Sequence, residues 1–414
     1  MHVRHPVWIG RFTSPGAESF ALLFALESFT RALLASVIPL QALQLLGDAS
    51  DVSLMFFAAA SASLLGGLLT PVLIHHTARR WVYSLGAVCL AFAPALLAMP
   101  GVVAMLAGMS LRVFGVVSMT VCINLYIIDN IPRRIMTLTE PKRLFYSAGA
   151  WMVGPALGVY LRTEFADWMP YAVSGLCALI MLIYFWYLRL IEHQVFTGRP
   201  ARAPGILSNL RTFSTQPRLV FAWWIAFGRN AWWALFFVYT PIYAVQAGLG
   251  EVAAGLLVSA GTAFLFLMPV FSLAVRQFGI RTVLLTGFSI SFIATALVAI
   301  LFQSPWLAAG CLMIAALAMV SLDAVGNVPF LLAVRPRGRA EMTAVYSTYR
   351  DAADIGPPGL FAVLLKVFEL PAIYLVGSLA MLALAGLSRR VHPRLGRQHR
   401  DPVPGLIHKP LPGL

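Results

Sequence analysis

Long apolar segments recur along the whole chain, and this feature constrains its fold more than any other. Each runs for about 18 residues or more between charged residues, Pro or Gly. A helix of about 20 apolar residues crosses a bilayer, so the pattern predicts an all-α integral membrane protein with twelve transmembrane helices. The expected spans lie near 17–46, 52–75, 82–100, 101–129, 144–161, 168–190, 219–247, 251–275, 281–302, 305–333, 342–366 and 370–388.

Charge is scarce and unevenly placed. Only 11% of the 414 residues are charged, against about a quarter in soluble proteins. Of the 30 Lys and Arg, 24 fall in alternate loops and at the two ends, whereas the opposite loops hold two of them and six acids. Basic loops stay in the cytoplasm during insertion, so we expect both termini to be cytoplasmic. The net charge of +14 therefore needs no nucleic acid to explain it.

The chain divides near its middle. Its longest polar break, rich in Pro, Arg and Ser, runs from Glu192 to Pro217 with six expected spans on each side. We expect an N-terminal six-helix bundle over 1–192, a cytoplasmic linker over 193–217, a C-terminal six-helix bundle over 218–388 and a basic cytoplasmic tail over 389–414. That tail is expected to lie against anionic headgroups.

The two halves are weakly similar to each other. At an offset near 200 residues, FTRALLASVIPLQA faces FGRNAWWALFFVYTPIYA, each with a central Arg and a later Pro. TPVLIHHTARRWVYSLG faces MPVFSLAVRQFGIRTVLLTG, and FYSAGAWMVGPALG faces VYSTYRDAADIGPPG. Repeats of this kind place a site between two related bundles.

These motifs together resemble the major facilitator superfamily along essentially the whole chain. The turn after Pro71 keeps the basic end of the family's loop motif at Arg79 and Arg80 but lacks its acid and glycines. The turn from Arg276 to Arg281 is closer to that motif. Arg112 with Gly115 resembles an arginine motif of the fourth helix, and GPALG from Gly154 resembles the end of a motif associated with antiporters.

The resemblance implies alternating access by two rocking bundles and an inner gate at the cytoplasmic helix ends. We assign gating to Arg79, Arg80, Asp129, Arg276, Gly154 and Pro155. For Gly154 and Pro155, plain helix packing is an equally good interpretation.

Charged residues inside the expected spans are the candidates for the site, because each needs a partner, a water-filled cavity or a function. In a transporter resembling this superfamily, the first, fourth, seventh and tenth helices line the cavity. Guanidinium groups bind carboxylates and phosphates in a two-pronged geometry, and aromatic groups supply apolar walls. The substrate-binding candidates are Arg31, Arg112, Arg229, Trp233, Asn327 and Tyr126.

Helical spacing leaves an alternative open for two of the buried arginines. Glu27, Arg31 and Gln41 fall in one sector of the first helix, and Glu27 and Arg31 could simply pair one turn apart. Arg350 could pair with Asp354 in the same way. Arg112 and Arg229 have no acid one turn away, so their partner is another helix or the substrate.

Energy coupling requires a group that changes protonation during the cycle, and buried carboxylates suit this role. The candidates are Asp323, Asp354 and Glu27. For Asp323, a plain salt bridge between helices is an equal alternative.

No enzyme motif, metal-ligand pair or cofactor loop is present in the sequence, so we expect neither an enzyme nor a cofactor. Its four cysteines are expected to be packed, reduced thiols. The leading hypothesis is a monomeric, proton-coupled carrier of a small organic anion or amphipathic metabolite. The runner-up is a proton antiporter for lipophilic cations, and a non-transporting receptor on the same scaffold comes third. The Arg-rich, Lys-poor composition favours a bacterial inner membrane.

Overall fold

A computed structural model of the chain describes residues 17–130, 133–188, 206–334 and 339–391. Within these ranges every regular element is a helix. In chain order the helices are α1 (Ala17–Leu33), α2 (Val37–Leu46), α3 (Ala49–His76), α4 (Arg79–Leu97), α5 (Val102–Asn130), α6 (Arg133–Glu164), α7 (Met169–Tyr187), α8 (Ile206–Ser214), α9 (Pro217–Gln246), α10 (Gly250–Ala263), the 3₁₀ turn η1 (Phe264–Leu267), α11 (Met268–Phe278), α12 (Ile280–Ile300), α13 (Pro305–Val325), α14 (Val328–Ala333), α15 (Arg339–Ser347), α16 (Tyr349–Leu364) and α17 (Pro371–Ser388).

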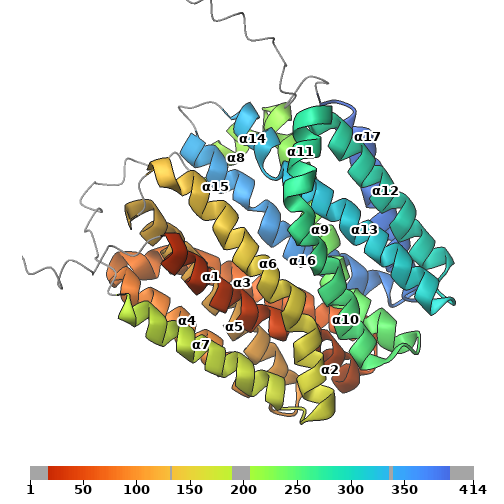
Figure 1. Cartoon of the computed structure of the whole chain (residues 1–414), viewed down its shortest axis with the longest axis horizontal. Helices are drawn as coiled ribbons and strands as arrows, with labels where there is room; N and C mark the ends of the chain where they lie inside the picture. Colours follow the sequence, from red (N-terminus) through yellow and green to blue (C-terminus); the bar gives the residue numbers. More distant parts are fainter. Residues whose placement is uncertain (1–16, 131–132, 189–205, 335–338, 392–414) are drawn as a thin grey trace, which may run out of the picture.

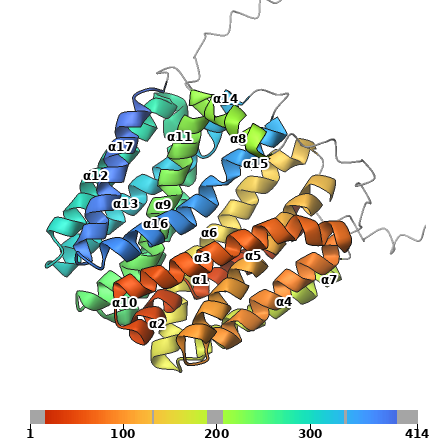
Figure 2. The ribbon, with the colours of Figure 1, turned by 180° about the vertical axis from the view of Figure 1, so that it is seen from behind.

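The helices form two groups that follow the order of the sequence. In the first group α1 packs on α6 and α7, and α4 packs on α5 and α7. In the second, α12 packs on α13 and α17, and α9 packs on α10 and α16. The groups meet along two seams, α3 against α16 and α6 against α10, on opposite faces of the molecule (Figures 1 and 2).

Nine of the described helical segments are long and apolar enough to cross a membrane. They account for nine of the twelve expected spans. The expected spans near 52–75, 219–247 and 342–366 are not among them. The first contains only a shorter apolar stretch, Ala49–Ala62, whereas the third is divided into α15 and α16. The second corresponds to α9, which is long enough but carries Arg218, Arg229 and Asn230.

The outer surface of the described helices is apolar, as a bilayer requires. Large side chains such as Ile183, Ile300, Trp306 and Val363 are each more than 60% exposed. A soluble monomer rarely exposes so much contiguous apolar surface. The four cysteines are free, three of them buried and Cys177 half-buried, which agrees with the expectation of packed thiols.

Several expected continuous helices are broken just before a proline. The breaks are the turn at 34–36, the 3₁₀ turn at 264–267 and the turn at 326–327, and they precede Pro39, Pro269 and Pro329. A proline has no N–H to donate, and its ring clashes with the carbonyl of the residue four positions earlier. The sequence pattern showed the apolar length of these segments but not these interruptions.

Short hydroxyl side chains join the two groups along both seams. Ser50 donates to the carbonyl oxygen of Ala362 at 2.9 Å, and the Ser53 and Tyr239 hydroxyls lie 2.7 Å apart. On the other face, Thr262 donates to the Trp151 carbonyl oxygen at 2.8 Å, and the Ser259 hydroxyl accepts from the Ala156 N–H at 2.9 Å. Small residues and single hydroxyls allow membrane helices to approach closely.

The GPALG segment packs against the break between α1 and α2. A Cβ on Gly154 would lie 2.6 Å from the Ala32 Cβ, and a Cβ on Gly158 would overlap the Leu33 carbonyl oxygen. The Pro155 carbonyl oxygen faces Gly255 of α10 across the seam. These contacts give Gly154 and Pro155 a packing role, and a hinge at this position is still a prediction.

Substituting Gly158→Ala should destabilise the protein by about 1–3 kcal/mol, because the new methyl group must displace backbone. Gly149→Ala in the same helix is the matched control, since its Cβ would meet nothing within 4 Å. That control should be neutral or slightly stabilising. Thermal unfolding of the two purified variants measures the difference, and equal melting temperatures would contradict the close approach.

Candidate functional site

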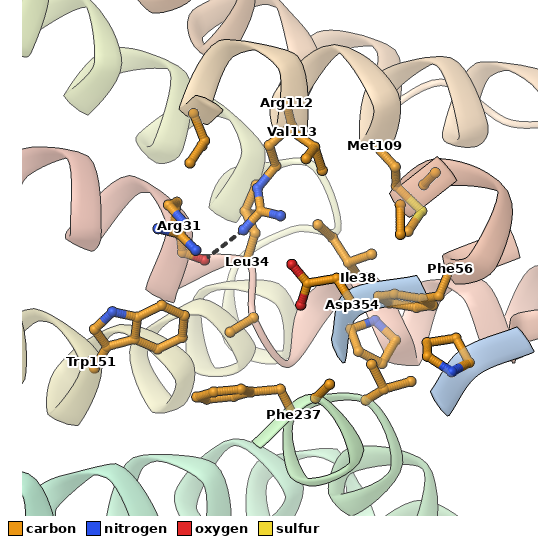
Figure 3. A pocket seen from close by; sticks show the side chains of 18 residues that line it. Arg31, Leu34, Ile38, Phe56, Met109, Arg112, Val113, Trp151, Phe237 and Asp354 are labelled. Atoms are coloured by element: carbon orange, nitrogen blue, oxygen red, sulfur yellow. Dashed lines mark hydrogen bonds between the residues drawn. The ribbon is translucent and has the colours of Figure 1, made fainter. Parts of the chain in front are cut away.

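A cavity of about 230 Å³ lies between the two groups of helices (Figure 3). The turn between α1 and α2, together with α3, α5 and α6, supplies one side, and α9 and α16 supply the other. Most of the lining is apolar or aromatic, and three charged side chains interrupt it. The lining residues are Arg31, Leu34, Ala35, Ile38, Pro39, Phe56, Ala59, Ala60, Met109, Arg112, Val113, Val116, Trp151, Ala234, Phe237, Val238, Asp354 and Pro358.

Arg112 is held by the backbone that the helix break exposes. In a continuous helix, the Ala35 N–H would donate to the Arg31 carbonyl oxygen. Here it donates to Ala32 at 3.0 Å instead. The Arg112 Nη2 donates to the Arg31 carbonyl oxygen at 3.1 Å, and its buried Nε has no hydrogen-bond partner in the described part of the chain. The guanidinium thus caps α1 while lining the cavity.

Arg31 reaches both an acid and an aromatic ring. Its Nη1 lies 3.2 Å from the Glu27 Oε1, which confirms the expected pair one turn apart. The Arg31 Cζ lies 5.8 Å from the centre of the Trp151 ring. The Arg31 side chain is 36% exposed whereas that of Glu27 is 6% exposed. Glu27 is therefore a buried brace, and Arg31 presents its remaining N–H groups to the cavity.

Asp354 is the acid of the cavity. Its carboxylate points into the space near Arg112 and Ile38 (Figure 3). Within the described ranges it makes neither an ion pair nor a hydrogen bond. The possible pair with Arg350 is not formed, because Arg350 is exposed and its Nε donates to the Tyr349 hydroxyl at 3.2 Å. Asp354 can therefore meet a ligand or a proton without breaking an existing contact.

Arg229 pairs with an acid on another helix. Its Nε lies 3.1 Å from the Asp323 Oδ1, and the Trp233 indole donates to the Asp323 Oδ2 at 3.0 Å. Neither charged group lines the cavity. Trp233 stacks on the cavity residue Phe237 with ring centres 5.6 Å apart, so the pair lies directly behind the aromatic wall. This is the interhelical salt bridge that the sequence left as an alternative for Asp323.

The other expected binding residues lie apart from the cavity. Tyr126 is fully buried among first-group helices, with its ring 5.8 Å from that of Phe185. Asn327 is exposed beside the break before α14 and accepts from the Tyr346 hydroxyl at 3.1 Å. Gln41, expected in the sector of Glu27 and Arg31, instead lies beyond the helix break, where it donates to the Leu97 carbonyl oxygen.

Of the expected gating residues, the charged ones lie at or near helix ends, whereas Gly154 and Pro155 lie inside α6. Arg79 and Arg80 begin α4, and Arg276 is near the end of α11. Asp129 is the second-to-last residue of α5, and its side chain lies outside the described residues. Their role in an inner gate stays a prediction.

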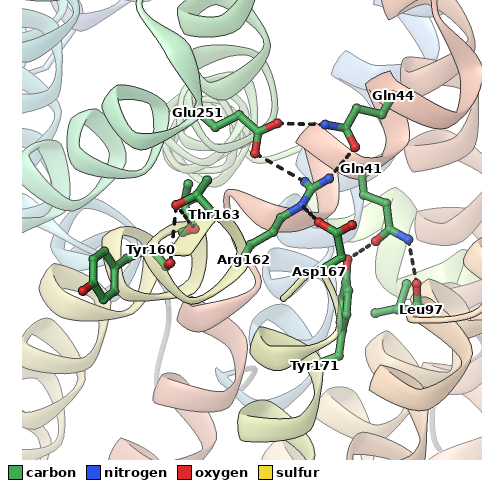
Figure 4. A network of polar contacts seen from close by, with 10 residues as sticks. Gln41, Gln44, Leu97, Tyr160, Arg162, Thr163, Asp167, Tyr171 and Glu251 are labelled. Carbon is green, nitrogen blue, oxygen red and sulfur yellow. Dashed lines mark hydrogen bonds and ion pairs between the residues drawn. The ribbon is translucent and has the colours of Figure 1, made fainter. Parts of the chain in front are cut away.

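A polar cluster ties the two groups together at one end of the molecule (Figure 4). The Arg162 side chain, 6% exposed, donates to Gln44 of α2 and lies 3.9 Å from Glu251 of α10 and 3.4 Å from Asp167. Glu251 accepts from Gln44 at 2.8 Å. Because Arg162 belongs to the first group and Glu251 to the second, these contacts hold the two groups together at that end.

Sequence reasoning expected aromatic walls but missed the residues that form them, and it missed this cluster. Trp151 and Phe237 face each other with ring centres 4.8 Å apart. Phe237 follows Trp233 by one helical turn, so extending that stripe would have found it. The cluster carried no comparable signal, since its members are far apart in the sequence.

The family profile described as Major Facilitator Superfamily matches residues 20–358. The chain belongs to this superfamily. The described part of the chain is all-helical with nine candidate spans, which agrees with the resemblance seen in the sequence. Membership of the superfamily also supports the function of a transporter. No sequence among the curated proteins matches the chain significantly.

Two solved superfamily transporters share the fold at low identity. The nucleoside transporter NupG aligns with a TM-score of 0.68 and 13% identity, covering 90% of this chain and 98% of its own. The peptide transporter POT in complex with sulfate aligns with a TM-score of 0.71 and 14% identity, covering 92% and 95%. At such identity the likeness extends to the fold and not to the substrate.

Removing one member of the Arg229–Asp323 pair should destabilise this superfamily member more than removing both. A buried charge without its partner costs about 3–5 kcal/mol. We expect Arg229→Met and Asp323→Leu each to lower the melting temperature strongly and the double variant to recover much of the loss. Arg276→Met, at an exposed position, is the control and should change stability by at most ~0.5 kcal/mol. Additive effects in the double variant would argue against a coupled pair.

Weakening the Arg162 cluster should open the cavity toward that end. Ile38 lines the cavity, so an Ile38→Cys variant without the native cysteines reports access to it. The measurement is the rate at which a membrane-impermeant maleimide labels the new thiol. A contact worth ~1 kcal/mol shifts a two-state equilibrium about fivefold. Glu251→Gln should therefore raise the labelling rate about fivefold. Glu164→Gln, an exposed acid nearby in α6, should not. Unchanged labelling in Glu251→Gln would exclude a gating role for the cluster.

Proposed function

We propose that the chain is a proton-coupled secondary transporter of a small amphipathic organic anion. It would work by alternating access of two six-helix bundles, twelve spans in all, joined by the linker at 193–217. Both termini would lie in the cytoplasm. The protein would be a monomer in a bacterial inner membrane. The observation that carries the proposal is the cavity between the two groups of helices, where Arg31 and Arg112 face an aromatic lining.

The cavity suits a compact, partly apolar anion. Arg112 has a buried Nε without a partner, and Arg31 keeps free N–H groups beside Trp151. Both could bind a carboxylate or phosphate through charge-assisted hydrogen bonds. Trp151, Phe237 and Phe56 would hold the apolar part of the substrate.

Asp354 is the group we propose for coupling. With its carboxylate charged, the charges of Arg31 and Arg112 are balanced by those of Glu27 and Asp354. Protonation of Asp354 would leave an excess of one positive charge, which favours an anion. Binding of a proton and binding of the anion would then reinforce each other, as symport requires.

A second candidate function follows from the same carboxylate. An ionised Asp354 among aromatic rings could bind a lipophilic cation, and a proton would then compete with that cation. This arrangement corresponds to antiport. The two functions predict opposite pH dependences: affinity for an anion should rise as the pH falls, whereas affinity for a cation should rise as the pH rises.

Thermal unfolding of the purified protein with panels of organic anions and lipophilic cations tests both, because a ligand of the native state raises the melting temperature. We expect stabilising anions at low pH and a shift that is lost in Arg112→Ala. Since Arg112 also caps α1, each ligand-induced shift is measured against the variant's own melting temperature. Stabilisation by cations alone would replace the anion carrier by the cation antiporter.

Asp354→Asn should abolish the pH dependence of ligand binding and proton movement in proteoliposomes, because the amide cannot exchange a proton. Asp351→Asn is the control variant, because Asp351 lies on the same helix but does not line the cavity. It should retain the pH dependence of ligand binding and the proton movement. Ligand-driven acidification or alkalinisation of the lumen, followed with an entrapped pH-sensitive dye, measures coupling. Coupling that persists in Asp354→Asn would move this role to Glu27 or Asp323.

A further inference from the structure

A second hollow lies where several helices begin or end, and it shares no lining residue with the cavity described above. Ser214 of α8, the first two turns of α9, the start of α12, α14 and the end of α17 surround about 1060 Å³. Figures 1 and 2 show α8, α14 and the end of α17 together at one end of the molecule. We call this hollow the arginine groove. Its lining is Ser214, Pro217, Arg218, Val220, Phe221, Trp224, Arg281, Pro329, Leu332, Ala333, Leu387, Arg389, Arg390 and Val391.

Four arginines and no acid line the arginine groove. They are Arg218, Arg281, Arg389 and Arg390. None of their guanidinium groups forms an ion pair or hydrogen bond with another described residue. Like charges gathered in one hollow repel one another, and that repulsion is relieved when an anion enters. The groove is therefore complementary to a negatively charged group.

Two of these arginines stand where a helix itself disfavours positive charge. Arg218 is the second residue of α9, and Arg281 is the second residue of α12. The N-terminus of a helix carries partial positive charge and favours anions. Helix stability therefore does not explain these arginines, whereas an anion in the groove would interact with both guanidinium groups and both helix ends.

The position and lining of the arginine groove match the headgroup level of a bilayer. Membrane-crossing helices such as α12 and α17 begin or end there. Beside the arginines, Trp224 is 45% exposed and Leu332 is 57% exposed. Tryptophan is enriched at the boundary between hydrocarbon and headgroups. A molecule that fills this groove would meet guanidinium groups at one end and apolar side chains at the other.

We propose that the arginine groove binds the headgroup phosphate of an anionic phospholipid. Basic pockets between transmembrane helices recognise such headgroups, and guanidinium groups bind phosphate in a two-pronged geometry. The chain's own tail is a poor occupant, because residues 392–414 contain four Lys and Arg against one acid. This site is separate from the proposed substrate cavity and holds whether or not the proposed substrate is correct.

Native mass spectrometry from mixed micelles tests the proposal with phosphatidylglycerol and phosphatidylcholine as probes. The variant Arg218→Gln/Arg281→Gln/Arg389→Gln/Arg390→Gln should bind phosphatidylglycerol at least about tenfold more weakly and phosphatidylcholine unchanged. The control variant, Arg211→Gln/Arg394→Gln/Arg397→Gln/Arg400→Gln, removes the same charge from Arg211, which is not among the lining residues, and from the basic tail. It should keep the binding of the original protein.

The outcomes that overturn the proposal are distinct. Equal loss in both variants would show diffuse attraction to a basic surface, and loss in the control alone would assign lipid binding to the tail. Displacement of the lipid by inorganic phosphate at equal concentration would make the groove a site for a soluble anion. If the groove variant does not fold, the corresponding Arg→Lys variant replaces it. That variant should retain attraction to phosphatidylglycerol but bind it more weakly than the original protein, and unchanged affinity would exclude two-pronged recognition.

Discussion

The break of the first span before Pro39 is the constraint on which the candidate site depends. Pro39 has no N–H to donate to the Ala35 carbonyl oxygen, and its ring clashes with that carbonyl, so the helix is interrupted just before it. α1 ends at Leu33, and the Ala35 N–H donates to Ala32 instead of Arg31. Arg112 replaces that donor from α5. Leu34 and Ala35 of this turn, with Ile38 and Pro39 at the start of α2, then line the cavity. One proline thus determines both where the cavity has its irregular wall and where a guanidinium is fixed beside it.

The same break packs closely against α6, and the close approach requires glycine at the points of contact. Gly154 and Gly158 of α6 provide it, since a methyl group at either position would meet the backbone of α1. A helix that ends inside a membrane leaves backbone groups that only protein or water can satisfy. Here they are satisfied by Arg112 and by the Ser174 hydroxyl, which donates to the Thr30 carbonyl oxygen at 3.0 Å. The GPALG motif, the proline and the arginine therefore act as one packing unit.

Much of the fold could be predicted because it depends on periodic apolar length and on charge placement. Nine of the twelve expected spans are among the candidate membrane helices, and the family follows from the sequence. The breaks were missed, since hydropathy measures the length of a segment and not its hydrogen bonding. The site was only partly foreseen. Arg31, Arg112 and Asp354 were predicted and do line the cavity. They could be predicted because charged residues are rare in the apolar spans and stand out there.

The partners of those charges could not be found from the sequence alone. Glu27 and Arg31 lie one turn apart, so their pairing was one of two possibilities that spacing allowed. The choice of Asp323 as partner for Arg229, and the contact between the Trp151 and Phe237 rings, depend on how separate helices are arranged. Tyr126 and Asn327 look equally polar in the sequence, yet they lie away from the cavity.

The hydroxyl contacts along the two seams affect how freely the protein can change shape. Each is a single neutral hydrogen bond on a short side chain, so sliding one group of helices past the other desolvates no charge at these positions. The ion pair described across the groups joins Arg162 to Glu251, whose side chains are 6% and 26% exposed. Separating the groups there exposes two opposite charges, so the balance between conformations should depend on how readily water reaches this pair, more than on the lipid surrounding the seams.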